Sequence, residues 1–103
     1  MPRRPPPPDP LDQALKHLAL ARAAGSPDQR RAHIASATWA LEDARVRLAE
    51  REDVVKWCEE RFAAAAAIIR VTVEHHRRQI EAAAVELVAL ELVAFAGNGG
   101  FSG

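Results

Sequence analysis

Cysteine and aromatic residues are scarce in this chain, and tyrosine is absent. Only 5% of the 103 residues are aromatic, which argues against the stacking surface of a protein that binds single-stranded nucleic acid. Cys58 is the one cysteine, so an intramolecular disulfide is impossible, as suits a reducing compartment. We therefore expect a cytoplasmic protein, or a component of a particle assembled inside the cell.

An excess of charge of either sign is also lacking. The 14 basic and 14 acidic side chains balance, so no net field draws the chain to nucleic acid or to an anionic membrane. The apolar stretch 82–96 is shorter than the ~20 residues that span a bilayer, and it contains Glu86 and Glu91. We expect no transmembrane segment, and neither nucleic acid nor a lipid surface is an expected partner.

Glycine and proline are confined to the two ends and one short connection. Six of the first ten residues are proline, so residues 1–9 are predicted to form an extended polyproline arm. Residues 97–103 contain four of the five glycines and are predicted to form a flexible tail. Between these ends, residues 10–96 are predicted to form one all-α domain.

Capping residues mark the starts of two helices. Asp9 followed by proline predicts a helix over 10–24, with Asp9 as its N-cap. Residues 25–29, Gly-Ser-Pro-Asp-Gln, combine a helix-ending glycine with the capping box of a second helix that begins at residue 27. Because this connection is so short, the first helix is expected to turn back along the second as an αα-hairpin.

The segment 27–96 carries a coiled-coil-like repeat. Large apolar residues recur every seven positions, which is the period of close helix packing, and the phase of the repeat changes at His76. No glycine or proline lies between residues 28 and 96, so one long helix is the preferred interpretation, with the charged residues 50–53 as a possible break. The predicted interface between copies consists of Ile34, Leu41, Leu48, Val55, Cys58, Phe62, Ile69, Ile80, Leu87 and Phe95.

The richest cluster of polar side chains is residues 73–81, which read V-E-H-H-R-R-Q-I-E. On a helix, His75 and His76 lie about 100° apart, so they do not chelate one metal ion as an i,i+4 pair does. A solvent-facing helix surface is the favoured interpretation. A pH-responsive or metal-bridged contact between subunits stays open, because His76 continues the heptad seam.

The other candidate residues are isolated in the sequence. His17 and His33 flank the first connection and can approach each other, but no carboxylate or cysteine lies beside them at the spacing of metal ligands. Cys58 has no base within reach along a helix and is expected to pack as a small hydrophobe. Trp39 and Val46 share a stripe that the first helix is expected to cover. We expect no enzyme and no cofactor.

The apolar surface of the long segment exceeds what the short first helix can cover. Residues 82–96 are apolar nearly all round, which is typical of a helix that is buried or bound. The first hypothesis is therefore a non-catalytic, homo-oligomeric structural subunit of a filament, shell or virus-like particle. The alternative is a small accessory or regulatory protein whose C-terminal helix docks on a larger protein partner.

Overall fold

Three helices make up the described part of the chain. The computed structural model describes residues 8–97, and the side chains of residues 8–94. The helices are α1 (Pro10–Ala23), α2 (Pro27–Arg61) and α3 (Ala63–Gly97), and no strand occurs among these residues. The predicted all-α class is confirmed. Residues 1–7 and 98–103, which hold most of the expected arm and tail, lie outside the described residues.

The first two helices begin where the capping residues predict. The Asp9 carboxylate accepts a hydrogen bond from the Leu11 N–H at 3.0 Å, and the Ser26 hydroxyl accepts one from the Gln29 N–H at 3.2 Å. Each cap satisfies one of the backbone donors that a helix start leaves unpaired. α1 ends at Ala23, one residue earlier than predicted, because the next residue takes an extended conformation.

The preference for one continuous helix over 27–96 is wrong, because the chain leaves the helical conformation at Phe62. This residue has φ −141° and ψ 75°. Its N–H donates to the Cys58 carbonyl at 2.6 Å, and its own carbonyl accepts from the Ala66 N–H at 3.0 Å. One residue therefore ends α2 and begins α3, without a glycine, a proline or a capping side chain.

The possible break at residues 50–53 is not used, since these residues are helical within α2. Glu50, Arg51 and Asp53 are exposed to solvent. The Glu52 carboxylate instead forms an ion pair with Arg77 of α3, at 2.5 Å. Because none of the four charged side chains is buried, the helix continues through them without a desolvation cost.

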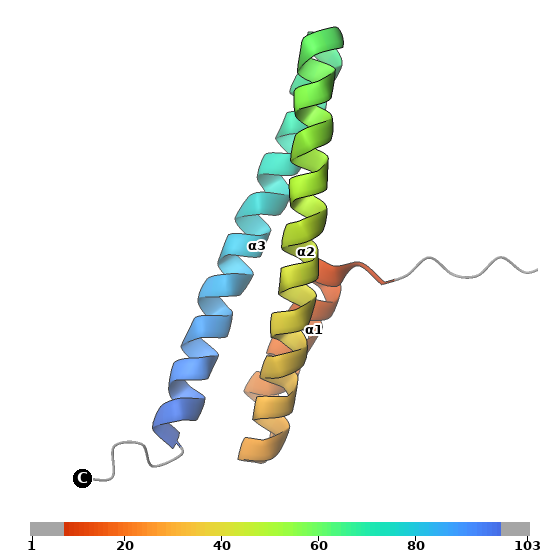
Figure 1. The fold of residues 1–103 in the computed structure, drawn as a ribbon. Coiled ribbons are helices and arrows are strands. Elements are labelled where there is room, and N and C mark those ends of the chain that lie inside the picture. The colour runs from red at the N-terminus through yellow and green to blue at the C-terminus, as the bar shows by residue number, and fades with distance from the viewer. Residues whose placement is uncertain (1–7, 98–103) are drawn as a thin grey trace, which may run out of the picture.

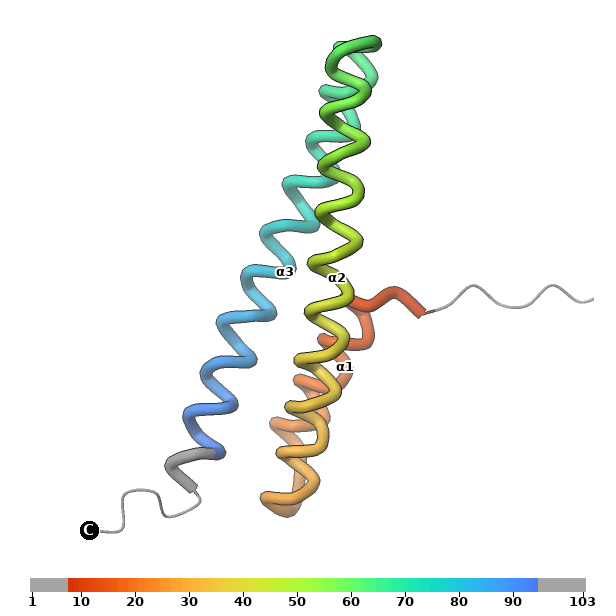
Figure 2. The backbone as a smooth tube through the Cα atoms, in the orientation of Figure 1, coloured from red at the N-terminus to blue at the C-terminus, as the bar shows by residue number. Residues whose placement is uncertain are grey.

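The two long helices meet at Phe62 and diverge from there, and α1 runs alongside the N-terminal half of α2 (Figure 1). Figure 2 shows the same path as a tube, with α3 at one edge of the molecule. The principal extents are 61 × 43 × 16 Å and the radius of gyration is 17.7 Å, against about 12–13 Å for a compact domain of this length. The molecule is therefore long and thin.

The core is a single layer of side chains between the helices. Six of its 14 buried apolar residues are alanine, which allows close approach of the helices but buries little area for each residue. Leu18 is the largest side chain that is fully buried. The main cluster consists of Leu11, Ala14, Leu18 and Ala21 from α1, Ile34, Ala37, Leu41 and Ala44 from α2, and Ile80, Ala83 and Leu87 from α3.

Two histidines meet where α1 packs on α2. The Nδ1 atoms of His17 and His33 lie 3.2 Å apart, and the rings stack with centroids at 5.4 Å. In this hydrogen bond, one Nδ1 carries a proton and donates, and the other Nδ1 is unprotonated and accepts. The contact therefore excludes two doubly protonated rings. Desolvation lowers the pKa of His17 from its usual value, and the charges of His33 and Lys16 lower it further.

Leu18→Ala is expected to lower the free energy of unfolding by about 3 kcal/mol, because it opens a cavity in the middle of the core. Leu15→Ala is the matched control on the same helix. Leu15 is 41% exposed, so its truncation should cost less than about 1 kcal/mol. Urea titrations followed by circular dichroism measure both values, and equal losses for the two variants would contradict the assigned core.

The stability of the fold is expected to fall below about pH 6.5. Because the pKa of folded His17 is lowered from 6.5, the unfolded chain takes up a proton at a higher pH than the folded chain does. The stability that depends on neutral His17 is fully present above the pKa of His17 in the unfolded chain. It is lost as the pH falls from there through the pKa of His17 in the folded chain. His17→Gln should flatten this dependence in thermal unfolding between about pH 7.5 and 5.5. An unchanged slope in the variant would contradict the assignment to His17.

Candidate interaction surface

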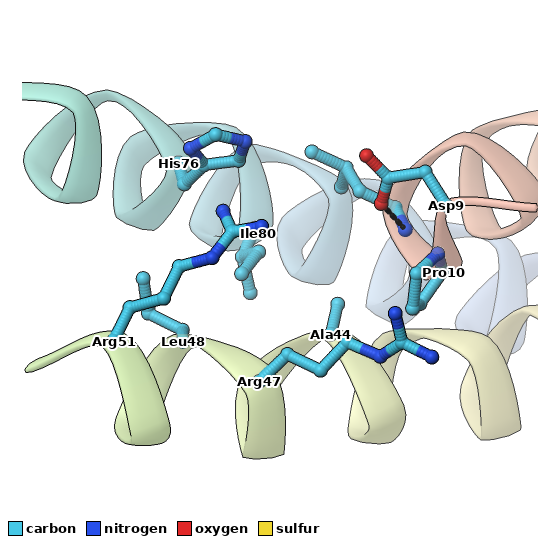
Figure 3. Close-up of a pocket in the computed structure, with 9 residues that line it drawn as sticks. Asp9, Pro10, Ala44, Arg47, Leu48, Arg51, His76 and Ile80 are labelled. Atoms are coloured by element: carbon cyan, nitrogen blue, oxygen red, sulfur yellow. Dashed lines mark hydrogen bonds between the residues drawn. The ribbon is translucent and has the colours of Figure 1, made fainter. Parts of the chain in front are cut away.

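A small pocket opens where all three helices come together. Its volume is about 190 Å³. Arg47 and Arg51 reach into it from α2, and His76 faces them from α3 (Figure 3). Asp9 contributes the one carboxylate, which already caps α1. The remaining lining residues are Pro10, Leu11, Ala44, Leu48 and Ile80.

This pocket is small, and most of its basic groups already have partners. It is smaller than the roughly 300–1,000 Å³ of ordinary ligand pockets, and its lining includes no hydroxyl or thiol nucleophile. The Nε of Arg47 lies 3.7 Å from Asp43, and the Nδ1 of His76 lies 3.1 Å from the Thr72 carbonyl. Two of its three basic groups therefore already have partners within their own helices.

The helix α3 distributes the motif at 73–81 over three different faces. Val73 and Ile80 are buried against α2 and α1. Arg77 lies at the side of α3, where it pairs with Glu74 and with Glu52 of α2, each at 2.5 Å. His75 is exposed on the far side. The two histidines thus point in different directions, as their sequence spacing predicts.

The structure does not bring three metal-ligating groups together in residues 8–94. No three histidine, cysteine, aspartate or glutamate side chains of this range could hold a metal ion jointly. Cys58 is half-buried on the face of α2 that packs against α3. Within residues 8–97, no helix combines the length and the hydropathy that crossing a membrane requires.

The surface that stands out instead is the outer face of α3. Alternating steps of three and four residues trace two seams along this helix. The inner seam is buried or half-buried throughout. It consists of Ala66, Ile69, Val73, His76, Ile80, Ala83, Leu87, Leu90 and Ala94.

The second seam, called the outer seam below, starts two residues later and so lies about 200° around the helix. All eight of its residues are exposed, and its large apolar members are 64–73% exposed. Val88 and Val93 lie beside it and are more than half exposed. Contiguous exposed apolar residues are typical of binding surfaces, so the outer seam is the candidate interaction surface. The outer seam consists of Ile68, Val71, His75, Arg78, Ala82, Val85, Ala89 and Leu92.

The residues predicted as an interface between copies mostly face the chain's own helices. Leu48, Cys58 and Ile69 are half-buried, Phe62 is 62% exposed at the turn, and the side chain of Phe95 lies outside the described residues. The heptad repeat is thus satisfied within one chain, which folds back on itself. The buried members of the set are Ile34, Leu41, Val55, Ile80 and Leu87.

The expected cover of Trp39 and Val46 by the first helix is wrong. Trp39 is 75% exposed and Val46 is 58% exposed, because α1 packs on the face of α2 that carries Ile34 and Leu41. Trp57, also on α2, is 53% exposed. The guanidinium of Arg61 lies 4.4 Å from the centre of the Trp57 ring.

Sequence reasoning noticed that residues 82–96 are apolar on every side but missed the outer seam. Its signal was present, since the three-four spacing runs without a break from Ile68 to Leu92. His75 and Arg78 interrupt the apolar pattern in the middle. Both residues also belong to the polar motif at 73–81, which hides their place in the seam. The position of the turn at Phe62 was needed to assign one seam to the inside and the other to the outside.

No protein-family model, curated protein or solved structure matches this chain.

Proposed function

We propose that the protein is a non-catalytic helical subunit of a homo-oligomeric assembly, and that copies associate through the outer seam of α3. The observation that carries this proposal is the exposure of a mostly apolar stripe with heptad spacing on a helix whose opposite face is already packed. A heptad pattern is the pattern of a helix that packs against another helix along its length. The outer seam has no such helix within residues 8–97.

The composition of the outer seam favours a helix as its partner. Ala82 and Ala89 alternate with Val85 and Leu92, so small and large side chains follow one another along the same line. A second helix with the same pattern can place large residues against small ones, as facing layers in packed helices do. The helix α3 of a second copy carries this same pattern and can serve as the partner.

The alternative is a small accessory protein whose C-terminal helix docks on a larger protein partner. Val88, Leu92 and Val93 favour it, because they widen the apolar surface near the end of α3, and each is more than half exposed. This arrangement resembles an amphipathic helix that docks in a groove. Homo-association is preferred because the heptad spacing extends to Ile68, far beyond the length of such an anchor.

Val85→Glu is expected to dissociate the oligomer. The variant introduces a charge at two interface positions of each dimer, so the dissociation constant should rise at least roughly 100-fold. Light scattering coupled to size exclusion measures the mass over a range of concentrations. The wild type should exceed the monomer mass of 11.2 kDa and the variant should approach it.

Val46→Glu is the matched control for this experiment. Val46 and Val85 are 58% and 71% exposed and lie on helices of equal length, so neither change should reduce helicity in circular dichroism. Only the change at Val85 should alter the mass. A wild-type chain that stays at 11.2 kDa at every concentration would sink the proposal, and capture of one defined larger partner by α3 would then support the alternative.

A further inference from the structure

We infer that two copies pair through their outer seams in an antiparallel orientation, with Ile68 of each copy facing Leu92 of the other. This inference rests on the proposed self-association and specifies its geometry. In this register Arg78 faces Ala82 of the second copy, and His75 faces Val85. The two polar positions in the middle of the seam determine the orientation and the register.

A parallel pairing brings identical residues face to face. It would therefore place His75 against His75 and Arg78 against Arg78 in the middle of a desolvated seam. The two Arg78 guanidinium charges would repel each other there at short distance. Antiparallel pairing places each of these residues opposite an apolar one instead. Ala82 is small, which leaves room for the long side chain of Arg78.

In the antiparallel register, each polar residue also meets a carboxylate. Glu81 lies one position before Ala82 on the flank of the outer seam, so Glu81 of the second copy comes beside Arg78. On the opposite flank, Glu86 of the second copy comes beside His75. Glu86 pairs with Arg22 of α1 through Oε1, which leaves Oε2 able to accept from His75. By symmetry the dimer contains two pairs of each kind.

Sliding one helix by a heptad in either direction removes this match. In one direction Val88 and Val93 of the second copy come beside Arg78 and His75, so both polar side chains are desolvated without a carboxylate. In the other direction His75 faces Arg78 of the second copy, and the Leu92 end of the seam extends past Ile68. One register of the three therefore pairs all eight seam positions and gives both polar side chains a carboxylate partner.

The surface of α3 is also shaped for this pairing. A shallow hollow of about 480 Å³ lies around Val71, lined by Ala67, Arg70, Val71, Glu74, His75 and Arg78. In the antiparallel register, Val85 and Val88 of the second copy lie over this hollow. Both valines are more than half exposed in the single chain. The pairing therefore fills a concave surface with side chains that otherwise face water.

Disulfide trapping in the full-length chain tests the register. The background is Cys58→Ser, which leaves only introduced thiols, and the two proteins carry Ile68→Cys or Leu92→Cys. A mixture of the two should form a covalent dimer under mild oxidation, seen on a non-reducing gel and mapped by mass spectrometry to the 68–92 pair. Each protein alone should stay uncrosslinked, because positions 68 and 92 then have no thiol opposite them.

The outcomes separate this inference from the proposed function. Crosslinks within each single-cysteine protein would mean parallel pairing and would overturn the register, whereas the assembly itself would stand. A dimer in light scattering without any of these crosslinks would also overturn the register. A monomer in light scattering would overturn both.

Charge reversal gives a second test that does not depend on cysteine geometry. Arg78→Glu places two carboxylates side by side at two symmetric sites, so the dissociation constant should rise roughly tenfold or more. The double variant Arg78→Glu with Glu81→Arg restores opposite charges and should return the constant to near the wild-type value. Failure of this rescue, with helicity preserved, would contradict the contact between Arg78 and Glu81.

Discussion

The turn at Phe62 determines which surfaces this chain can bury by itself. With one residue outside the helical conformation, α3 runs back along α2 from their shared end, and there is no loop to adjust their approach. Ala66, fully buried in the first turns of α3, permits close contact at that end. The helices then diverge, and α1 fills the wider end with Leu11 and Leu18. The core is therefore continuous but only one layer deep.

A core of this kind covers one stripe of each long helix and leaves the opposite stripe exposed. On α2 the exposed side carries several charged residues, among them Glu50 and Asp53. The end of α3 differs, because no basic residue follows Arg78 and the outer seam beyond it is entirely apolar. Exposure of Val85 and Leu92 to water is the unfavourable part of the single-chain structure. The proposed association of α3 with another helix would remove this exposure.

The helix starts and the fold class could be predicted from the sequence, because Asp9 and Ser26 act through bonds to residues two or three positions away. The turn at Phe62 could not, since it uses no capping side chain and results from the packing of α3 on α2. The seam of Ile34 and Leu41 was recognised as a packing surface. Its partner was assigned to another copy because a continuous helix offers no surface of its own chain.

The apparent change of phase at His76 has the same origin. Once α2 and α3 are separate helices, their repeats need not share a phase, and the inner seam of α3 runs from Ala66 to Ala94 without interruption. Likewise, the residues of the polar motif at 73–81 lie on three different sides of one helix: the inner side, the lateral side and the outer side. Its meaning depends on where the neighbouring helices lie, which the local sequence does not encode.

The polar residues of the outer seam are better suited to specificity than to affinity. Apolar residues in place of His75 and Arg78 would bind a partner helix more tightly. Such a surface would, however, allow either orientation of that helix and several registers. A twofold interface between outer seams is also complete with two copies, since each seam is then covered. A filament or shell therefore needs a second surface on the same chain.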